Sequence, residues 1–290
     1  MLSREAQRVA ENIRKAKEWR KTLSIEEQRE LQKKSRTMPL PDDAVRKFFT
    51  VNQVEVETVT LPSSQKDSAL VLIHGGGFKS GSSAVGRWIT AQIARQTGQT
   101  VYSINYRLAP EFTYPTATID CVSVWSYLLD NGIKPEKSSI MGTSAGGTIA
   151  ISLALWCRDH SIPLPSSLIL NSPDIAKSIK PTEYEIKEDI MLNYDENEEN
   201  PYFSTAEDDD CYAFPILANF TGFPPVALYA AEKEILHQHS VILEKLLTRD
   251  EVEHTFTDDK ELWHAFLNSP VPENVKYSEE IAAFIMKNKK

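Results

Sequence analysis

Short apolar segments recur along the chain from residue 69 onward. They read ALVLIH, TVYSINY, SSIMG, SLILNS, PVALYAA and VEHTFTD, and segments with helical periodicity separate most of them. The helical segments include Thr116–Asn131, Ala145–His160, Ser240–Asp250 and a last helix over Glu273–Lys289. Nearly continuous apolar runs of this length are typical of parallel strands that are buried on both faces. The alternation predicts an α/β protein with a mainly parallel central sheet flanked by helices.

The N-terminal segment has a different pattern. Apolar residues recur there at helical spacing up to residue 37, which predicts two helices. Ser24 and Glu27 form a capping-box pattern, so the second helix is expected to begin at Ile25. Pro39 is expected to end it, because proline lacks the backbone N–H that a helix interior uses.

Residues 175–222 interrupt the alternation of strands and helices. This segment is acidic, contains three prolines and lacks a clear strand pattern. An insertion of this length in an α/β enzyme is more often a lid or cap than a linker. We therefore expect one catalytic core over residues 45–290, beginning with two strands in Val45–Leu61, and a helical cap built from residues 1–44 and 175–222.

Charge and cysteine content exclude several classes of protein. The 290 residues include 32 basic and 41 acidic side chains, a net charge of −9, which argues against general binding to nucleic acid. Three cysteines, Cys121, Cys157 and Cys211, are too few for a disulfide framework and lack the spacing of a zinc site. A cytoplasmic location is the expectation that fits this cysteine content.

The hydropathy pattern predicts no stable insertion into a membrane. No apolar run approaches the ~18 residues that a membrane span needs, and the first residues lack the apolar centre of a secretory signal. The N-terminal helix could instead hold the protein on a membrane surface. Its apolar face is mostly Ala and Val, however, which favours a place in the cap.

One glycine-rich turn carries a candidate nucleophile. The segment Gly142–Gly146 reads GTSAG, follows a predicted strand and precedes an apolar helix. This strand–turn–helix context is that of the G-x-S-x-G elbow, in which small neighbours allow a strained serine backbone and a close approach of strand and helix. Ser144 then lies at a helix N-terminus, where N–H groups favour developing negative charge. The competing interpretation is an ordinary glycine-rich turn between a strand and a helix.

A second glycine-rich segment follows an earlier strand. Residues 74–78 read HGGGF, and three glycines let backbone N–H groups turn toward a ligand, as in an oxyanion hole. A phosphate-binding loop would instead require G-x-x-x-x-G-K-[ST], which this segment does not match. His74 is expected to fix the loop by hydrogen bonding rather than to act as a base.

A serine nucleophile needs a base and an orienting carboxylate. His264 lies after the last predicted strand, where parallel sheets place their chemistry. The acid is expected after the strand PVALYAA, and its candidates there and further along the chain are Glu232, Glu234, Asp258 and Asp259. A metal site built from Glu234, His237 and His239 lacks further clustered ligands, and no metal or organic cofactor is expected.

These motifs together resemble the hormone-sensitive-lipase-like branch of the α/β-hydrolase esterases. HGGGF and GTSAGG match its two signature motifs, and YRLAPEFTYPTA resembles its third conserved stretch. NPYFSTAEDD and GFPPVALYAAEKEIL resemble the segment that ends in its catalytic acid. The resemblance covers about residues 45–285, and Thr143 before the serine indicates the GTSAG subgroup. Residues 1–44 resemble the family only in forming an N-terminal helical cap.

The resemblance implies a role for each matching residue. Ser144 would be the nucleophile, His264 the general base and Glu234 the acid, with oxyanion donors at the N–H groups of Gly76, Gly77 and Ala145. The acid departs from the family pattern, because Glu234 and Ile235 stand where Asp and Pro are usual. Glu232 therefore remains the alternative acid.

The implied activity is that of a serine carboxylesterase. It would hydrolyse short-chain acyl esters through a Ser-His-acid triad and an acyl-enzyme intermediate, with a small-molecule ester as substrate. An amidase, deacetylase, peptidase or thioesterase on the same triad is an alternative, because all share the tetrahedral intermediate. A ligand-binding protein without activity is a further alternative on the same fold. Members of this branch often dimerise, so a homodimer is a prediction as well.

Overall fold

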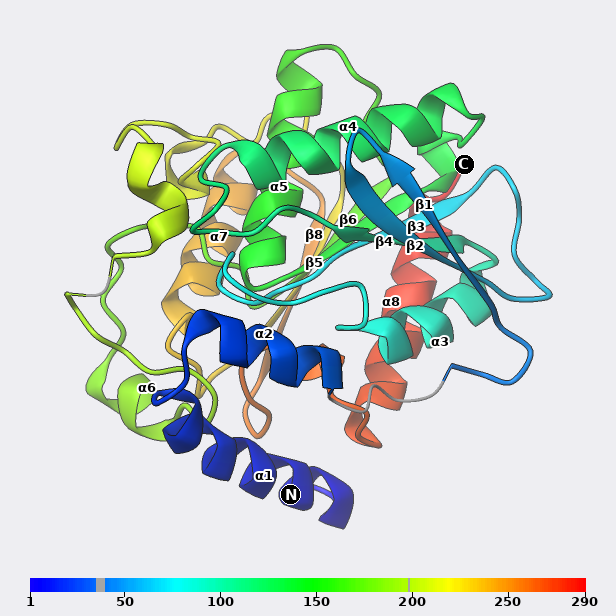
Figure 1. Cartoon of the computed structure of the whole chain (residues 1–290). Helices are drawn as coiled ribbons and strands as arrows, with labels where there is room; N and C mark the ends of the chain where they lie inside the picture. Colours follow the sequence, from blue (N-terminus) through cyan, green and yellow to red (C-terminus); the bar gives the residue numbers. More distant parts are fainter. Residues whose placement is uncertain (35–39, 198) are drawn as a thin grey trace.

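The central element is one eight-stranded sheet, and the computed structural model describes residues 1–34, 40–197 and 199–290 (Figure 1). The strand order is β1-β2-β4-β3-β5-β6-β7-β8. Strand β2 pairs antiparallel with β1 and β4, and the remaining pairs are parallel. The strands are β1 Val45–Val51, β2 Val54–Thr60, β3 Ala69–Ile73, β4 Thr100–Asn105, β5 Ser139–Thr143, β6 Ser167–Asn171, β7 Val226–Ala231 and β8 His254–Asp259. The predicted α/β fold with a mainly parallel sheet is confirmed.

Helices cover both faces of this sheet. The helices of the core are α3 Arg87–Thr97, α4 Thr116–Asp130, α5 Ala145–Asp159, α7 His237–Arg249 and α8 Glu273–Asn288. Helices α4, α5 and α7 share one buried cluster with the sheet, whereas α3 and α8 belong to a second cluster on the other face. The central strands of the sheet are therefore buried on both sides, as the apolar runs predict.

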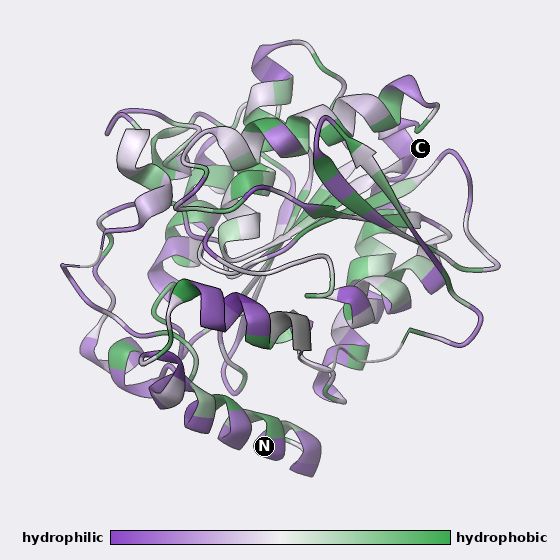
Figure 2. Cartoon of the chain, viewed as in Figure 1, coloured by the Kyte–Doolittle hydropathy of each residue, from purple (hydrophilic) through white to green (hydrophobic). Residues whose placement is uncertain are grey.

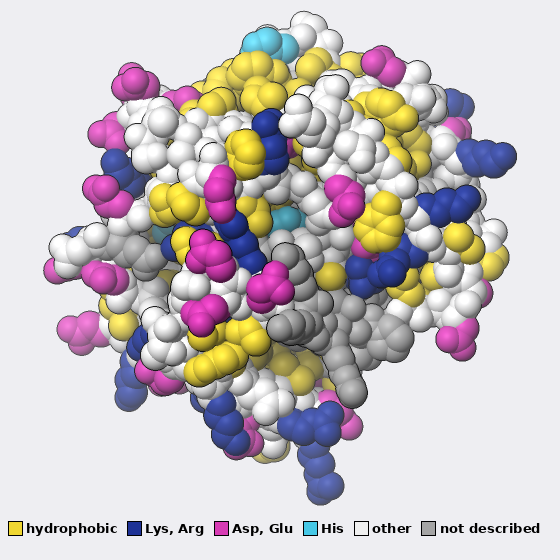
Figure 3. Space-filling view, in the orientation of Figure 1, with side chains coloured by type: hydrophobic (Ala, Val, Ile, Leu, Met, Phe, Trp, Pro, Cys, Tyr) yellow, Lys and Arg dark blue, Asp and Glu magenta, His cyan; other side chains and the backbone are white. Residues whose placement is uncertain are grey.

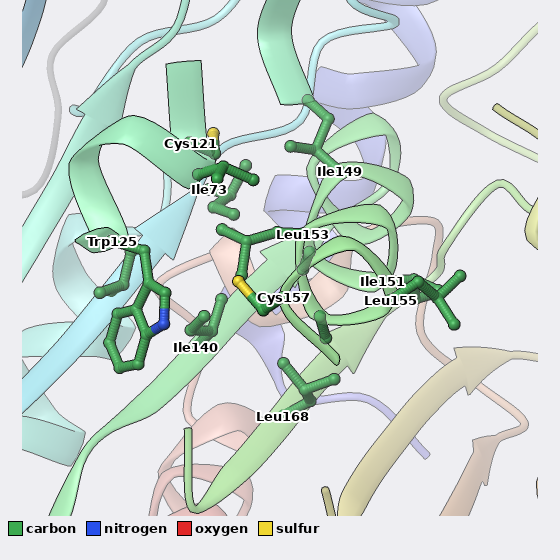
Figure 4. Close-up of a cluster of buried hydrophobic side chains, with 14 of the residues drawn as sticks. Ile73, Cys121, Trp125, Ile140, Ile149, Ile151, Leu153, Leu155, Cys157 and Leu168 are labelled. Carbon is green, nitrogen blue, oxygen red and sulfur yellow. The ribbon is translucent and has the colours of Figure 1, made fainter. Parts of the chain in front are cut away.

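The apolar composition of the inner elements explains this layering. Strands β3, β5, β6 and β7 are buried at every position. Figure 2 shows the hydrophobic residues concentrated in the sheet and in α5. Figure 4 shows Leu153 and Cys157 of α5 packed near Ile140 of β5, beside Trp125 of α4. Burial of an aliphatic or aromatic side chain stabilises a fold by about 1.5–3 kcal/mol, so this layer is a main source of stability.

Of the two segments outside this core, the first is mostly helical and the second is mostly irregular. The first contains α1 Arg4–Arg20 and α2 Ile25–Lys34, and the predicted start at Ile25 is confirmed. The helix end predicted at Pro39 lies outside the described residues. Residues 175–222 contain α6 Glu183–Glu188 and the 3₁₀ turns Pro201–Thr205 and Pro215–Leu217, with no strand among their described residues.

Two features of the elements differ from the sequence prediction. Helix α7 begins at His237 rather than Ser240, and α3 was not among the predicted helices. Both helices start without a side-chain cap: the residue before α7 is Leu236, and the residue before α3 is Gly86. Their N-termini therefore carry no capping signal that a sequence pattern could reveal. Within the part of the chain that is described, no helix has both the length and the apolar character that crossing a bilayer demands.

Candidate active site

Ser144 occupies the sharp turn between β5 and α5. Its backbone has φ 54° and ψ −124°, a conformation that costs energy for a residue with a side chain. The neighbouring glycines make the turn sterically feasible. A Cβ on Gly146 would lie 2.2 Å from the carbonyl oxygen of Ile73, and a Cβ on Gly142 would lie 2.3 Å from that of Gly146. Because Gly142 and Gly146 have no Cβ atom, α5 can pack closely against the sheet directly behind the serine.

His264 lies between Ser144 and Glu234. Its Nε2 is 3.0 Å from Ser144 Oγ, and its Nδ1 is 2.5 Å from Glu234 Oε2. A carboxylate only accepts hydrogen bonds, so Nδ1 carries the proton and Nε2 is the acceptor for the serine hydroxyl. The structure therefore brings together the predicted serine, histidine and Glu234 in the order that proton transfer from the serine requires.

Glu234 is held in place although it is one methylene longer than aspartate. Its Oε1 accepts the N–H of Ala231 at 3.0 Å, which leaves Oε2 for the histidine. The Glu234 side chain is fully buried and that of His264 is 3 % exposed. A buried carboxylate is strongly coupled to its partner, because little water screens the interaction.

Opposing effects set the pKa of His264. Burial disfavours the imidazolium and lowers the pKa, whereas the hydrogen bond and charge of Glu234 raise it. The charges of Asp189 and Asp174 raise it further, and the net pKa lies above the ordinary value of 6.5. The environment thus favours the imidazolium that forms when His264 accepts a proton.

Two residues that the sequence analysis did not select support this relay. Ser172 Oγ accepts the N–H of Ala265 at 3.0 Å, directly after the histidine. Asp189 Oδ2 accepts the N–H of Ile235 at 2.9 Å, directly after Glu234. Asp189 lies 46 residues before that partner, and no local pattern indicates such a contact. Both side chains fix a backbone N–H beside the relay, so they orient the loops that carry Glu234 and His264.

The loop Gly75–Gly77 packs directly against the nucleophile. A Cβ on Gly75 would lie 2.8 Å from the carbonyl oxygen of Thr143 and 3.2 Å from the Cβ of Ser144, so a side chain at this position would force the loop away from the nucleophile. Gly76 has φ 133° and Gly77 has φ 60°, which are conformations that favour glycine. Within the described residues, the N–H groups of Gly76, Gly77 and Ala145 donate to no protein acceptor. They remain free to bind an oxygen atom of a ligand.

The carbonyl groups of Gly75 and Gly76 accept hydrogen bonds from neighbouring residues. Gly75 O accepts from His74 Nδ1 at 2.9 Å, and Gly76 O accepts from the N–H of Ser80 at 3.0 Å. In a trans peptide the N–H points opposite to the preceding carbonyl. Anchoring the carbonyls of Gly75 and Gly76 therefore fixes the directions of the N–H groups of Gly76 and Gly77.

His74 holds the loop, as the sequence predicts. Its ring stacks on Tyr106 with centroids 4.2 Å apart, and Tyr106 Oη donates to the carbonyl of His74 at 2.9 Å. Burial lowers the pKa of His74 to about 4, although the hydrogen bond to Gly75 raises it. A neutral, buried ring that donates a hydrogen bond to its own loop is suited to holding that loop in position rather than to transferring protons.

The remaining candidates for the acid lie away from His264. Asp258 accepts a hydrogen bond from His237 Nε2 at 2.9 Å, and Asp259 accepts one from Tyr277. Glu232 is not among the partners of His264 in the described structure, and its backbone N–H donates to the Asp259 carbonyl. The geometry thus favours Glu234 over the alternative Glu232.

The three residues considered as metal ligands face different partners. Glu234 faces His264, His237 lies between Glu185 and Asp258, and His239 Nδ1 is 3.1 Å from Asp174 Oδ1. Over the described ranges, no group of three His, Cys, Asp or Glu side chains is arranged to hold a metal ion.

These elements define a class of protein. Ser144, Glu234, His264 and the glycine loop all follow the carboxyl ends of parallel strands, at one edge of a mostly parallel sheet. A serine on a strained elbow, a histidine within hydrogen-bonding distance and free N–H groups nearby form a site suited to acyl transfer. The fold and the site are those of an α/β hydrolase.

Comparison with known proteins leads to the same class. Residues 70–268 match the model of the family described as alpha/beta hydrolase fold, and the chain belongs to this family. It is 30% identical over 219 residues to an esterase of Acinetobacter venetianus, covering 73% of this chain and 72% of that protein. An acetyl-hydrolase of Streptomyces hygroscopicus is 27% identical over 251 residues, 84% of this chain and 82% of the relative.

A solved structure extends the likeness to the whole chain. An esterase from the bacterial hormone-sensitive lipase family superposes with a TM-score of 0.90 at 25% identity, covering 100% of both chains. The resemblance to the hormone-sensitive-lipase-like branch is therefore confirmed. The structural match includes the described residues 1–34 and 40–44, where the sequence resemblance is only general.

Proposed function

We propose that this protein is a serine carboxylesterase that hydrolyses short-chain acyl esters. The class, a carboxylic ester hydrolase of the alpha/beta hydrolase family, follows from the family and from relatives named esterase and acetyl-hydrolase. The observation that carries the proposed mechanism is the relay of Ser144, His264 and Glu234, with 3.0 Å and 2.5 Å between successive groups.

In the acylation step, Ser144 Oγ attacks the carbonyl carbon of the ester while His264 Nε2 accepts its proton. Glu234 stabilises the imidazolium through Nδ1. The carbonyl oxygen becomes an oxyanion that accepts hydrogen bonds from Gly76, Gly77 and Ala145, and each such donor typically lowers the barrier by about 3 kcal/mol. His264 then protonates the leaving alcohol, which departs as the acyl-enzyme forms.

In the deacylation step, water attacks the acyl carbon and gives its proton to His264. The second tetrahedral intermediate uses the same donors, and its collapse returns the proton to Ser144 Oγ. The products are the carboxylic acid and the free serine. The chain's own side chains and backbone N–H groups supply every proton transfer and charge contact in this sequence.

The surroundings of the loop support an apolar acyl group of limited size. Phe78, at the end of the glycine loop, stacks on Tyr202 with centroids 4.4 Å apart and meets Phe203 edge-on at 5.0 Å. Phe203 also contacts Phe214 at 5.1 Å. Tyr202, Phe203 and Phe214 belong to residues 175–222, which we propose form the cap together with residues 1–44. A cap that brings aromatic rings next to the site favours small, apolar esters.

Two further features are part of the proposal and follow from the sequence and the resemblance. The substrate is a small-molecule ester in the cytoplasm, and the protein works as a homodimer. Size-exclusion chromatography with light scattering measures the second of these, since a homodimer has twice the mass of the 32.7 kDa chain.

Hydrolysis of p-nitrophenyl acetate, butyrate and decanoate tests the activity. We expect turnover of acetate and butyrate, weaker turnover of decanoate, and loss of turnover in Ser144→Ala. Equal rates for the wild type and Ser144→Ala would contradict the proposal. Turnover of p-nitroacetanilide at rates above those of the acetate ester would point to an amidase instead.

A matched pair of variants tests the acid. Glu234→Ala removes the partner of His264, whereas Glu232→Ala removes a carboxylate two residues away that has no contact with the histidine. We expect kcat to fall about 10⁴-fold in the first variant, as losses of an orienting carboxylate do, and to change little in the second. The opposite ranking would make Glu232 the acid.

A further inference from the structure

The side chain of Arg29 connects α2 to two loops of the active site. Its Nε donates to the carbonyl of Lys79 at 2.7 Å, and its Nη2 donates to the carbonyl of Ala109 at 2.7 Å. Nη1 and Nη2 also form a bidentate pair with Glu111, at 2.7 Å and 2.9 Å. The loops that follow β3 and β4 carry these three partners, and in Figure 1 α2 lies beside the cyan loop that follows β3.

One of these loops supplies the proposed oxyanion donors. Lys79 lies two residues after Gly77, and both its N–H and that of Ser80 donate to the carbonyl of Gly76. The turn Gly76–Ser80 is thus closed by its own hydrogen bonds, and Arg29 holds it from outside at Lys79. Ala109 donates from its N–H to the carbonyl of Phe78 at 2.9 Å. Arg29 therefore bonds both loops at the point where they meet.

The loop needs such support because of its composition. Gly76 and Gly77 have no side chain that packing could hold, and glycine loses more backbone freedom than any other residue when it is fixed. Oxyanion donors must stay within a few tenths of an ångström of their position to stabilise the transition state. Contacts from outside the loop therefore add to the restraint that the loop's own hydrogen bonds provide.

The second outer segment holds the same loop from another residue. Asn200 Nδ2 donates to the carbonyl of Gly77 at 3.2 Å, and the ring of Tyr202 stacks on Phe78. The contacts of Arg29 and Asn200 thus lie on either side of Phe78. Residues far apart in the sequence, from the two proposed cap segments, converge on one loop of five residues.

The chemistry of arginine suits this place. The Arg29 side chain is 20 % exposed and that of Glu111 is 49 % exposed. The hydrogen bond from Arg29 holds the pKa of Glu111 at about 2, so the pair is ionised at every pH used to assay esterases. A planar guanidinium can donate to two carbonyl groups and a carboxylate at once, whereas the lysine ammonium is a single point of charge. Figure 3 shows basic and acidic side chains interspersed on this face of the molecule.

We propose that Arg29 is a positioning residue for the oxyanion loop, so that the N-terminal segment takes part in catalysis and does more than cover the site. This inference rests on the proposed esterase function. Arg29 does not touch the reacting atoms; it acts through the carbonyl groups of Lys79 and Ala109. Its removal should weaken binding of the transition state more than binding of the ester.

Kinetics of Arg29→Ala and Arg29→Lys test this inference, with Arg95→Ala as the control. Arg95 forms a bidentate pair with Asp43 at 2.7 Å and 3.1 Å, so it also ties the N-terminal segment to the core, but away from the glycine loop. We expect kcat on p-nitrophenyl butyrate to fall at least about tenfold in Arg29→Ala, less in Arg29→Lys, and within about twofold of the wild type in Arg95→Ala. KM should change by less than about threefold in all three.

A trifluoromethyl alkyl ketone distinguishes positioning from mere stabilisation of the fold. Ser144 Oγ adds to its carbonyl carbon, the serine proton passes to His264, and the carbonyl oxygen becomes an oxyanion held by the same donors. If Arg29 positions the loop, the inhibition constant rises in Arg29→Ala by about the factor by which kcat falls. The assays are run well below the melting temperature of each variant.

Different outcomes separate the hypotheses. A lower melting temperature with unchanged kcat and unchanged inhibition constant would overturn the inference and leave Arg29 a structural residue. A rise in KM with unchanged kcat would overturn it as well, because it would assign Arg29 to substrate binding. If Arg29→Ala does not fold, Arg29→Lys carries the test. Its kcat should then fall, and its inhibition constant should rise by about the same factor. Absence of Ser144-dependent turnover in the wild type would count against the esterase function itself.

Discussion

Burial and charge act on His264 in opposite directions, and their balance determines how the site responds to pH. The net pKa is raised, because Glu234 and the more distant Asp189 and Asp174 outweigh burial. A general base must be unprotonated before it accepts the serine proton. A raised pKa therefore means that the site needs a higher pH to become active than free imidazole would suggest.

We predict an acid limb in the pH profile of kcat/KM for p-nitrophenyl butyrate. Activity should rise with pH, with an inflection above about 6.5, the ordinary pKa of histidine. Glu234→Gln removes the carboxylate charge that contributes most to raising the pKa of His264, whereas the burial that lowers this pKa remains. The inflection of the residual activity should therefore move to lower pH. An inflection that stays in place in this variant would show that Glu234 does not control the protonation of His264.

At the scale of single residues, the sequence reveals those site residues whose motifs are contiguous. Ser144 and the glycine loop lie in short motifs, and His264 follows a predicted strand. The sequence alone does not separate Glu234 from Glu232 as the acid, because glutamate is longer than the aspartate that is usual there and can reach the histidine from a different backbone position. Arg29, Asp189 and Asn200 escaped notice because their partners lie 46 to 123 residues away, and only the folded chain reveals those contacts.

At the scale of elements, the elbow between β5 and α5 depends on the absence of side chains. A Cβ on Gly146 would lie 2.2 Å from Ile73 O and 2.5 Å from His74 O, and neither backbone group can move without disturbing β3. Gly132 has a positive φ of 89° as well, but nothing lies within 4 Å of the place of its Cβ. A side chain at position 146 would therefore meet steric crowding, whereas a side chain at position 132 would meet only backbone strain.

We predict that Gly146→Ala lowers the free energy of unfolding by about 3 kcal/mol or more, whereas Gly132→Ala lowers it by about 1 kcal/mol. Urea unfolding followed by circular dichroism measures both. Similar losses in the two variants would mean that strain, not crowding, makes glycine necessary at the elbow.

A second contact between elements is made by His237, the first residue of α7, which lies between α6 and the end of β8. His237 Nδ1 is 3.1 Å from Glu185 Oε1, and its Nε2 is 2.9 Å from Asp258 Oδ2. Gln238 Nε2 donates to the same Glu185 oxygen at 3.0 Å. A ring that meets two carboxylates needs both protons, so the imidazolium is the form that fits. Burial lowers the pKa of His237, but Asp258 and Glu185 raise it by more.

We predict that this contact stabilises the protein at low pH and is lost as the pH rises. Because the folded pKa lies above the unfolded one, the contribution is complete below about 6.5 and disappears above the raised pKa. The difference in melting temperature between the wild type and His237→Gln should be larger at pH 6 than at pH 9. A larger difference at pH 9 would contradict the prediction.

The sheet was the most predictable element. Each of these runs proved to be a strand, and the central strands β3, β5, β6 and β7 are buried on both faces, which leaves an unbroken hydrophobic pattern. Helix boundaries were less predictable where no capping residue marks them, as at α3 and α7. The irregular structure of residues 175–222 has no periodicity, so its turns could be located only in the structure.

At the scale of the whole molecule, α1 shares a buried cluster with the core and with residues 175–222. Ala6 and Ala10 of α1 lie in the same cluster as Ile190 and as Leu262 and Trp263, which precede His264. Ser3 Oγ also donates to Glu273 at the start of α8. The proposed cap and the core are therefore joined by one continuous hydrophobic layer.

We predict that the chain unfolds in one cooperative transition. Far-ultraviolet circular dichroism and tryptophan fluorescence should give the same midpoint. Ala6→Asp, which places a charge at a fully buried position, should lower the stability by about 3 kcal/mol without splitting the transition. Gln7→Asp, at the exposed neighbouring position, should have little effect. An early transition confined to part of the chain would mean that the N-terminal segment unfolds separately.

The central claim is that Ser144 is a nucleophile activated by His264 and Glu234. Labelling with a p-nitrophenyl alkylphosphonate tests it most directly, because the serine oxygen displaces p-nitrophenolate from phosphorus and forms a stable adduct. Peptide mass spectrometry then locates the label. We predict one adduct per chain, on the peptide that contains Ser144, with none in Ser144→Ala and much slower labelling in His264→Ala. A label at another residue, or no label on the folded wild type, would contradict the claim.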